Sequence, residues 1–382
     1  MRRTVLIVPG LLSGTGSDSF LRQKLPALSA LAELGDIRRV TPVPESVTPE
    51  AMFLGLGPNS VGLQQGPLTV SALGFDPPER STHFHLSLMS YADGIASTPS
   101  ALPTSDEVDL LLKESKRLDT KLLTVLKGEV FDHALVWESL GDLETTHPSG
   151  LLGQNIGKLL PNGDGDVGLR RLIDDSINLL SSLDLNERRF DQGLPPFNLL
   201  WPWGQGIRTP VPNLALRRGE PAAVESGSMR VAGLTRLAGY RHIDRHLFGR
   251  GLQTKFRKVA ERALNRDLTI VVVDAPMELR AKDKPEELEW FVREMDRELL
   301  QPLLDDCLNE RDRVCLIAPG PVVPSESQGM AASAVGLSLS LEHGVIGNNV
   351  YPFDERSLDE RKIPVQDLWA LVDAAITNSD QP

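Results

Sequence analysis

Apolar residues recur along the chain with two spacings, which predict strands and helices in alternation. Short apolar runs that end in turn residues predict buried strands, and they cover residues 4–8, 134–137, 198–201, 269–274, 314–318 and 335–341. Residues 270–273 are one isoleucine and three valines, which is typical of a parallel strand covered on both faces. The pattern therefore predicts a largely buried sheet.

Apolar residues at helical spacing fill the stretches between these runs. They predict helices over residues 19–34, 106–126, 167–183 and 284–308. The last helix has the clearest apolar stripe, from Leu288 to Cys307, and Pro285 suits its first turn. Strands that alternate with helices favour an α/β fold with a mainly parallel sheet flanked by helices.

Length and charge narrow the classes of function. A chain of 382 residues suggests two or three domains. The net charge is −12 and no long basic run occurs, which argues against partners such as nucleic acids and anionic membrane surfaces. The first apolar run is too short for a signal peptide, and no stretch approaches the ~18 apolar residues of a membrane helix.

The two cysteines, Cys307 and Cys315, fall in a predicted helix and a predicted strand. Their spacing fits neither a disulfide framework nor a zinc site. We expect both to be reduced core residues, which favours a cytoplasmic protein.

Several blocks of sequence, in a fixed order, carry a family resemblance. They are LPALSALAELG at residues 25–35, VSALGFDP at 70–77, GLPPFN and WGQG within 193–206, and VVVDAPME at 271–278, followed by a helix that contains Asp296. In this order the blocks resemble the archaeal-type, cofactor-independent phosphoglycerate mutases of the alkaline phosphatase superfamily.

The resemblance implies a fold and a chemistry. Residues 1–80 and 190–382 are expected to form a discontinuous alkaline phosphatase-like core, and residues 81–189 an inserted, smaller α/β cap domain. Enzymes of this family move a phosphoryl group between the 2- and 3-positions of glycerate through a phosphorylated serine. They use two divalent cations, manganese, zinc or magnesium, which neutralise the phosphoryl charge.

The residues of this chain at the family's reacting positions have other chemistry. Gln65 stands at the nucleophilic serine, and Thr69 stands at the histidine four residues later. At the metal-ligand positions the chain has Pro9, Met277, Ala281, Pro319 with Gly320, and Met330. The family's phosphate-binding motif has no clear match. We therefore expect no metal cofactor and no catalytic nucleophile.

These substitutions predict a degenerate, non-catalytic homologue that binds a ligand or a partner. The vestigial cleft between core and cap is less polar than in the family, so it suits a small organic ligand better than a bare phosphate. A homo-oligomer or a protein partner is left open. Two enzyme alternatives remain: a divergent metal-dependent mutase or phosphotransferase with shifted ligands, and a metal-free serine hydrolase.

Two serines are candidates for these alternatives. Ser60, within GPNSVG, resembles the nucleophile motif of the larger cofactor-independent mutases, although a turn serine is favoured. Ser327, within SESQG, loosely resembles a nucleophile elbow. The histidine that could serve it, His343, follows only sixteen residues later with Glu342 beside it, which is a poor spacing for a triad.

Histidine pairs and tryptophans complete the candidates. His83 and His85 alternate on a strand and could share a metal, but a solvated strand face is favoured. His242 and His246, with neighbouring arginines, could bind an anion, but an exposed helix face is favoured. Trp201 and Trp203 are expected in the core and at the domain interface.

Overall fold

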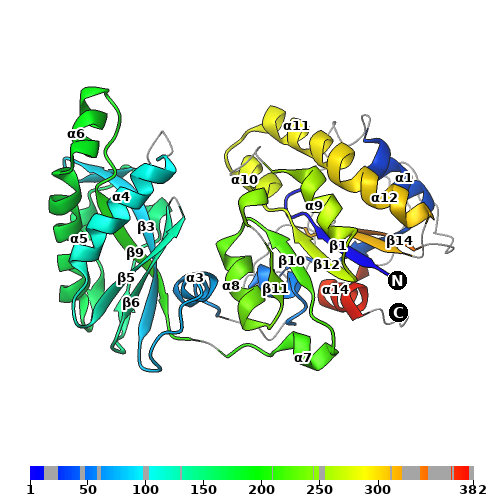
Figure 1. Ribbon diagram of the computed structural model, residues 1–382, viewed down its shortest axis with the longest axis horizontal. Coiled ribbons are helices and arrows are strands. Elements are labelled where there is room, and N and C mark those ends of the chain that lie inside the picture. Colours follow the sequence, from blue (N-terminus) through cyan, green and yellow to red (C-terminus); the bar gives the residue numbers. More distant parts are fainter. Residues whose placement is uncertain are drawn as a thin grey trace. The chain divides into compact units, whose positions relative to one another are not determined.

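The computed structural model describes residues 1–12, 25–43, 48–57, 62–97, 103–129, 131–208, 210–243, 245–248, 254–309, 312–320, 336–342, 363 and 365–377. The chain forms two compact units, which we call the first unit (Met1–Gly62 and Val211–Pro382) and the second unit (Leu63–Pro210). Figure 1 labels their elements along the chain.

The first unit contains a mixed, largely parallel sheet. Its strands are β1 (Arg3–Ile7), β2 (Asp36–Val40), β10 (Ala223–Ser226), β11 (Arg241–His242), β12 (Leu268–Val272), β13 (Arg313–Ala318), β14 (Gly336–Glu342) and β15 (Val365–Gln366), in the order β11-β10-β12-β1-β13-β14-β2-β15. β11, β10, β12, β1 and β13 run parallel, whereas β14 is antiparallel to both of its neighbours. The predicted α/β fold with a mainly parallel sheet is confirmed.

Helices flank this sheet. They are α1 (Pro26–Leu34), α2 (Pro49–Phe53), α7 (Leu214–Arg218), α8 (Met229–Leu237), α9 (Phe256–Ala263), α10 (Ala275–Ala281), α11 (Pro285–Met295), α12 (Gln301–Asn309) and α14 (Leu368–Thr377). Apolar residues of α1, α9, α11 and α12 pack on one face of the sheet in a single core cluster (Figure 1). The helix predicted over residues 284–308 is confirmed, with Pro285 in its first turn.

A π-helical turn, η7 (Asp296–Leu300), joins α11 to α12 and directs one carboxylate inward. Asp296 is 2% exposed and accepts hydrogen bonds from the backbone N–H groups of Leu28 (2.7 Å) and Ala27 (3.2 Å). Helix α1 has no side-chain cap of its own. The Asp296 carboxylate therefore caps α1 from another helix, which accounts for an aspartate at this point of the sequence.

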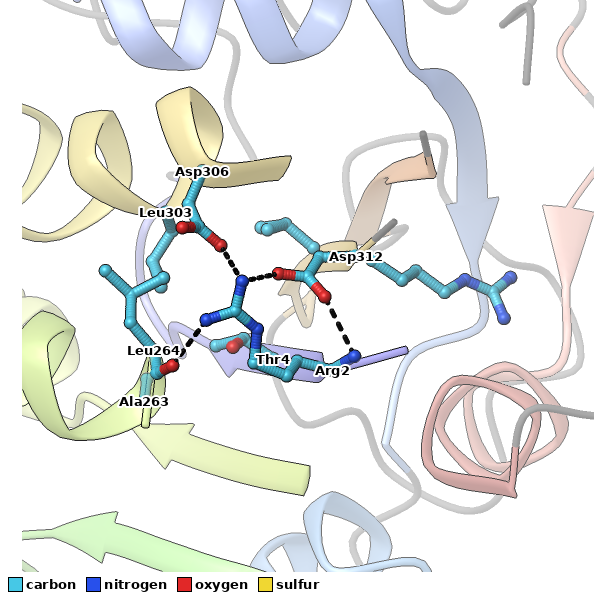
Figure 2. Close-up of a pocket in the computed structure, with 9 residues that line it drawn as sticks. Arg2, Thr4, Ala263, Leu264, Leu303, Asp306 and Asp312 are labelled. Atoms are coloured by element: carbon cyan, nitrogen blue, oxygen red, sulfur yellow. Dashed lines mark hydrogen bonds and ion pairs between the residues drawn. The ribbon is translucent and has the colours of Figure 1, made fainter. Parts of the chain in front are cut away.

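Arg2 fastens the amino end of β1. Its guanidinium lies 2.6 Å from a carboxylate oxygen of Asp306 and 2.6 Å from one of Asp312. It also donates to the carbonyl of Leu264 at 2.6 Å (Figure 2). One side chain thus ties β1 to α12, to the start of β13 and to the segment after α9. These two ion pairs and the bond to Leu264 hold the amino end of β1 in place.

The second unit has an antiparallel sheet with β3 at its centre. Its strands are β3 (Thr82–Ala92), β4 (Ile95–Ser97), β5 (Leu123–Glu129), β6 (Asp132–Trp137) and β9 (Leu199–Gly206). β3 pairs with β4, β6 and β9. A small ribbon of β7 (Leu143–Glu144) and β8 (Asn162–Gly163) lies apart from this sheet.

Helices of the second unit are α3 (Gln65–Ala72), α4 (Ser105–Ser115), α5 (Asp166–Ser181) and α6 (Asp184–Asp191). Phe84, Leu86 and Leu88 of β3 join a core cluster with residues of α4, α5 and α6. Alternate residues of a strand point to opposite faces, so His83 and His85 lie on the other face. Helix α3 packs against β3, β6 and β9.

Two sequence-based boundaries differ from the structure. The cap was expected to span residues 81–189, but α3 and β9 also belong to the second unit, because β9 is paired with β3 and α3 is packed on both strands. The helix expected over residues 106–126 is wrong at its end. The chain leaves helical structure after Leu118, where the Asp119 carboxylate accepts from the N–H of Val125 in β5.

Both cysteines are buried and free, Cys307 in α12 and Cys315 in β13, as expected. Trp201 is fully buried, which confirms its place in a core. Among the residues that the structure describes, none of the helices combines the length and the apolar character needed to cross a membrane.

Candidate functional site

Gln65 and Thr69 lie one turn apart on α3 and meet His85 of β3. The hydroxyl oxygen of Thr69 is 2.9 Å from Nδ1 of His85, and Nε2 of Gln65 donates to the same hydroxyl at 3.3 Å. Thr69, His85 and Gln65 are 0%, 3% and 8% exposed. The two positions that stand for the nucleophile and its histidine are thus brought together, but as a buried hydrogen-bond cluster.

The His85 ring lies between a carboxylate and this hydroxyl. Nε2 of His85 lies 3.5 Å from a carboxylate oxygen of Asp132. The Thr69 hydroxyl donates its single proton to the backbone carbonyl of Gln65 at 2.9 Å, and its oxygen lies beside Nδ1 of His85. Burial, and next the charge of His147, lower the pKa of His85 to about 3, so the imidazole is neutral near neutral pH.

Glycines let α3 approach the strands closely. A Cβ on Gly66 would lie 2.2 Å from the carbonyl oxygen of His83. Cβ atoms on Gly204 and Gly206 would lie 2.8 Å from the Cβ atoms of Gln65 and Gln64. The WGQG block therefore has a packing role, because only glycine permits this approach of α3 to β9.

The face of β3 that carries His83 and His85 is covered. His83 is 2% exposed and lies 2.9 Å from the Ser81 hydroxyl, and burial, then Arg208, lower its pKa to about 4. The Trp203 ring packs beside His85 and donates to the Ser87 hydroxyl at 2.9 Å. The expectation of a solvated strand face is therefore wrong, because α3 and the Trp203 side chain cover it.

In the first unit, the other positions gather at the carboxyl edge of the parallel strands. Pro9 follows β1 and Pro319 follows the adjacent strand β13. Gly10, with φ +76°, lies so close to α10 that an added Cβ would be 2.5 Å from Cα of Met277. Pro9 is buried, Met277 is half exposed, and Ala281 lies one turn further along α10.

Arg280 is a residue of this edge that sequence reasoning missed. Its Nε donates to the carbonyl of Gly10, and its NH2 group donates to the carbonyl of Leu11 at 3.0 Å. Arg280 lies between Met277 and Ala281, two positions that the resemblance assigns to metal ligands. A basic residue between them was the signal that could have identified it.

Carboxylates also occupy this edge. Asp274 follows β12, and burial, then the charges of Glu50 and Glu278, raise its pKa to about 7, although a hydrogen bond from Ser228 opposes the shift. Arg230 neutralises part of this charge, since its Nε donates to Glu50 at 2.9 Å. Asp274 therefore holds a proton over part of the acidic range in the folded protein.

The residues at the family's metal-ligand positions do not fit two hard dications. Pro9, Met277, Ala281, Pro319 and Gly320 provide no side-chain oxygen or nitrogen. Within the described ranges, no group of three or more histidine, cysteine, aspartate or glutamate side chains could hold a metal ion. Several candidates lie outside the described residues: Ser60, Ser327, Met330 and His343.

The expected anion site around His242 is not on a helix. His242 ends β11, and a short 3₁₀ turn, η5 (Arg245–Leu247), follows. The imidazole Nε2 of His242 lies 3.2 Å from the backbone carbonyl of Ser226 and is half-buried. The expectation of an exposed helix face is wrong, because the backbone here joins the edge of the sheet.

No family model matches the chain. Curated relatives do. The chain is 26% identical over 377 residues to a 2,3-bisphosphoglycerate-independent phosphoglycerate mutase of Methanosarcina mazei, covering 94% of this chain and 95% of that protein. It is 25% identical to the mutase of that name from Methanothrix thermoacetophila, covering 88% of each. The chain is related to the cofactor-independent phosphoglycerate mutases.

Two solved structures share the fold of this chain. A protein from Pyrococcus horikoshii superposes with a TM-score of 0.73 at 17% identity, covering 100% of this chain and 99% of that one. A cofactor-independent phosphoglycerate mutase from Thermoplasma acidophilum gives 0.61 at 19% identity, covering 99% and 100%. The alkaline phosphatase-like fold expected from the sequence blocks is thereby confirmed.

Proposed function

We propose that this chain is a non-catalytic homologue of the cofactor-independent phosphoglycerate mutases, which acts by binding a ligand or a partner. One observation carries the proposal: the side chains at the nucleophile and histidine positions are buried in a hydrogen-bond cluster. Gln65 and Thr69 bond to each other and contact His85 inside the second unit. At the metal-ligand positions, the Met277 backbone packs against Gly10 and its side chain offers no oxygen or nitrogen.

The chemistry of these side chains supports the proposal. A serine oxygen is a strong nucleophile only when a base or a metal activates it, whereas the Gln65 amide is not a nucleophile. Phosphoryl transfer depends almost entirely on positioning and on charge neutralisation. Proline, methionine and alanine supply no negative charge or lone pair for hard cations. The small organic ligand expected from the sequence remains a prediction.

The test is a paired measurement on the full-length protein. The chain is incubated with Mn²⁺, Zn²⁺ or Mg²⁺, desalted and analysed for bound metal, and 3-phosphoglycerate turnover is followed with an enolase-coupled assay. The mutase of Methanosarcina mazei is the positive control. We expect well under one equivalent of metal and no turnover above the buffer rate. About two equivalents together with turnover would establish the divergent metal-dependent mutase instead.

A serine probe distinguishes the hydrolase alternative. A fluorophosphonate label on Ser60 or Ser327, abolished by Ser60→Ala or Ser327→Ala, would indicate an activated serine and contradict the proposal. We expect no labelling above that of the heat-denatured protein, because an unactivated serine reacts slowly.

A further inference from the structure

The Arg280 side chain holds the start of the loop after β1 to α10. Arg280 donates through Nε to the carbonyl of Gly10 and through NH2 to that of Leu11. Leu11 is fully buried, and Gly10 adopts a left-handed backbone conformation. The loop therefore turns sharply at the carboxyl edge of the sheet, and the carbonyl groups of Gly10 and Leu11 accept hydrogen bonds from a cation.

The Arg280 guanidinium lies among the positions whose residues do not fit metal ions. Met277 and Ala281 precede and follow Arg280 on α10, and Pro9 directly precedes Gly10 in the chain. We propose that Arg280 is the resident cation of this edge, a clasp that holds the loop after β1 on α10 so that the first unit keeps its shape without a metal. The proposal rests on the proposed function, because both assume that no dication binds here.

Guanidinium chemistry suits this task. It keeps its positive charge at every physiological pH and offers donors in a rigid fork, so two neighbouring carbonyl groups can be held at once. Hydrogen bonds from a charged donor are the stronger class. A lysine ammonium is a point charge on a flexible stem and reproduces this geometry only in part. A metal ion would instead require carboxylate or imidazole ligands, which Pro9, Met277 and Ala281 do not supply.

The test combines hydrogen exchange and thermal unfolding of the full chain. Arg280→Met keeps the apolar stem and removes the clasp. We expect its amide exchange within residues 8–12 and α10 to rise about tenfold, and the melting temperature to fall by about 4 °C or more. Arg280→Lys should lie between this variant and the wild type. EDTA or Mn²⁺ should leave the wild-type exchange unchanged.

Arg293→Met is the matched control, because Arg293 on α11 forms an ion pair with exposed Glu289, one turn away on the same helix. We expect a change of under ~1 °C from this surface pair. Wild-type-like exchange in Arg280→Met, or a wild type protected by Mn²⁺ at residues 8–12, would overturn the clasp.

The outcomes separate the two proposals. If Arg280→Met does not fold, the Arg280→Lys variant and the EDTA and Mn²⁺ measurements on the wild type still decide the question. Mutase turnover with bound metal overturns the proposed function. If hydrogen exchange is unchanged in the Arg280 variants, and the wild type shows neither bound metal nor turnover, only the clasp is overturned.

Discussion

Helix α3 of the second unit and helix α10 of the first both carry residues at the mutases' reacting positions, yet different interactions hold them. The polar side chains of α3 are buried and bonded to His85. On α10, Met277 and Ala281 are exposed, and the neighbouring Arg280 binds backbone carbonyls. A buried polar group must find a partner, whereas an exposed apolar one needs none. The residues at these positions therefore form a hydrogen-bond cluster in one unit, and in the other they flank the clasp that we propose.

The largest expected effects come from two glycines at the contacts of these helices, Gly66 within α3 and Gly10 against α10. Gly66→Ala would place a methyl group 2.2 Å from the carbonyl oxygen of His83, and Gly10→Ala would place one 2.5 Å from Cα of Met277. Both neighbours are backbone atoms, so relief requires a shift of α3 or α10. We expect each variant to lose about 3 kcal/mol in urea unfolding.

Gly168→Ala is the control for these variants. Gly168 lies in α5, and its added methyl group would meet only a side-chain atom of Leu123 at 3.8 Å. We expect a gain of about 0.5–1 kcal/mol, because alanine favours helix. A Gly66→Ala variant as stable as the wild type would mean that α3 is not packed on β3 as described.

Acid should affect the two units in opposite directions. His83 and His85 have a pKa of about 4 and about 3 in the folded protein, against 6.5 when unfolded. As the pH falls below 6.5, the unfolded chain takes up protons first, so the second unit loses stability, by about 2 kcal/mol for each histidine near pH 5.

Asp274 gives the first unit the opposite dependence of stability on pH. Its pKa rises from 3.8 to about 7 on folding, so the folded form binds the proton more tightly and stability falls as the pH rises from 3.8 towards 7. Hydrogen exchange corrected for intrinsic rates at pH 5 and pH 7 reports each unit separately. His85→Gln should weaken the acid response of the second unit, and Asp274→Asn should flatten that of the first. Parallel responses of both units would contradict these assignments.

The smallest expected effect tests the hydroxyl of Thr69. Thr69→Val keeps the shape of the side chain and removes its hydroxyl, so the buried Gln65 carbonyl loses a donor and Nδ1 of His85 loses a polar contact. We expect a loss of about 1–2 kcal/mol. Thr69→Ser retains the hydroxyl and should lose less. The ¹⁵N shifts of the His85 ring should change in Thr69→Val and stay close to the wild type in Thr69→Ser, and unchanged shifts in Thr69→Val would contradict this contact.

The sequence predicted much of the first unit and less of the site. The β-branched run at residues 270–273 predicted β12, and the apolar stripe behind Pro285 predicted the long helix, because both patterns repeat over many residues. It missed α3, a short helix whose residues are buried on nearly every side and so show no periodic stripe. It also missed Arg280, since the carbonyl groups it binds lie some 270 residues away in the chain.

The amino-acid sequence by itself determined which elements form and which chemical groups stand at the family positions, because periodicity and side-chain chemistry are local properties. Only the tertiary structure decided that α3 and β9 belong with β3, that His83 and His85 are covered, and that Arg280 reaches the loop after β1. Each of these depends on contacts between residues far apart in the chain, at distances of a few ångströms that no spacing along the sequence specifies.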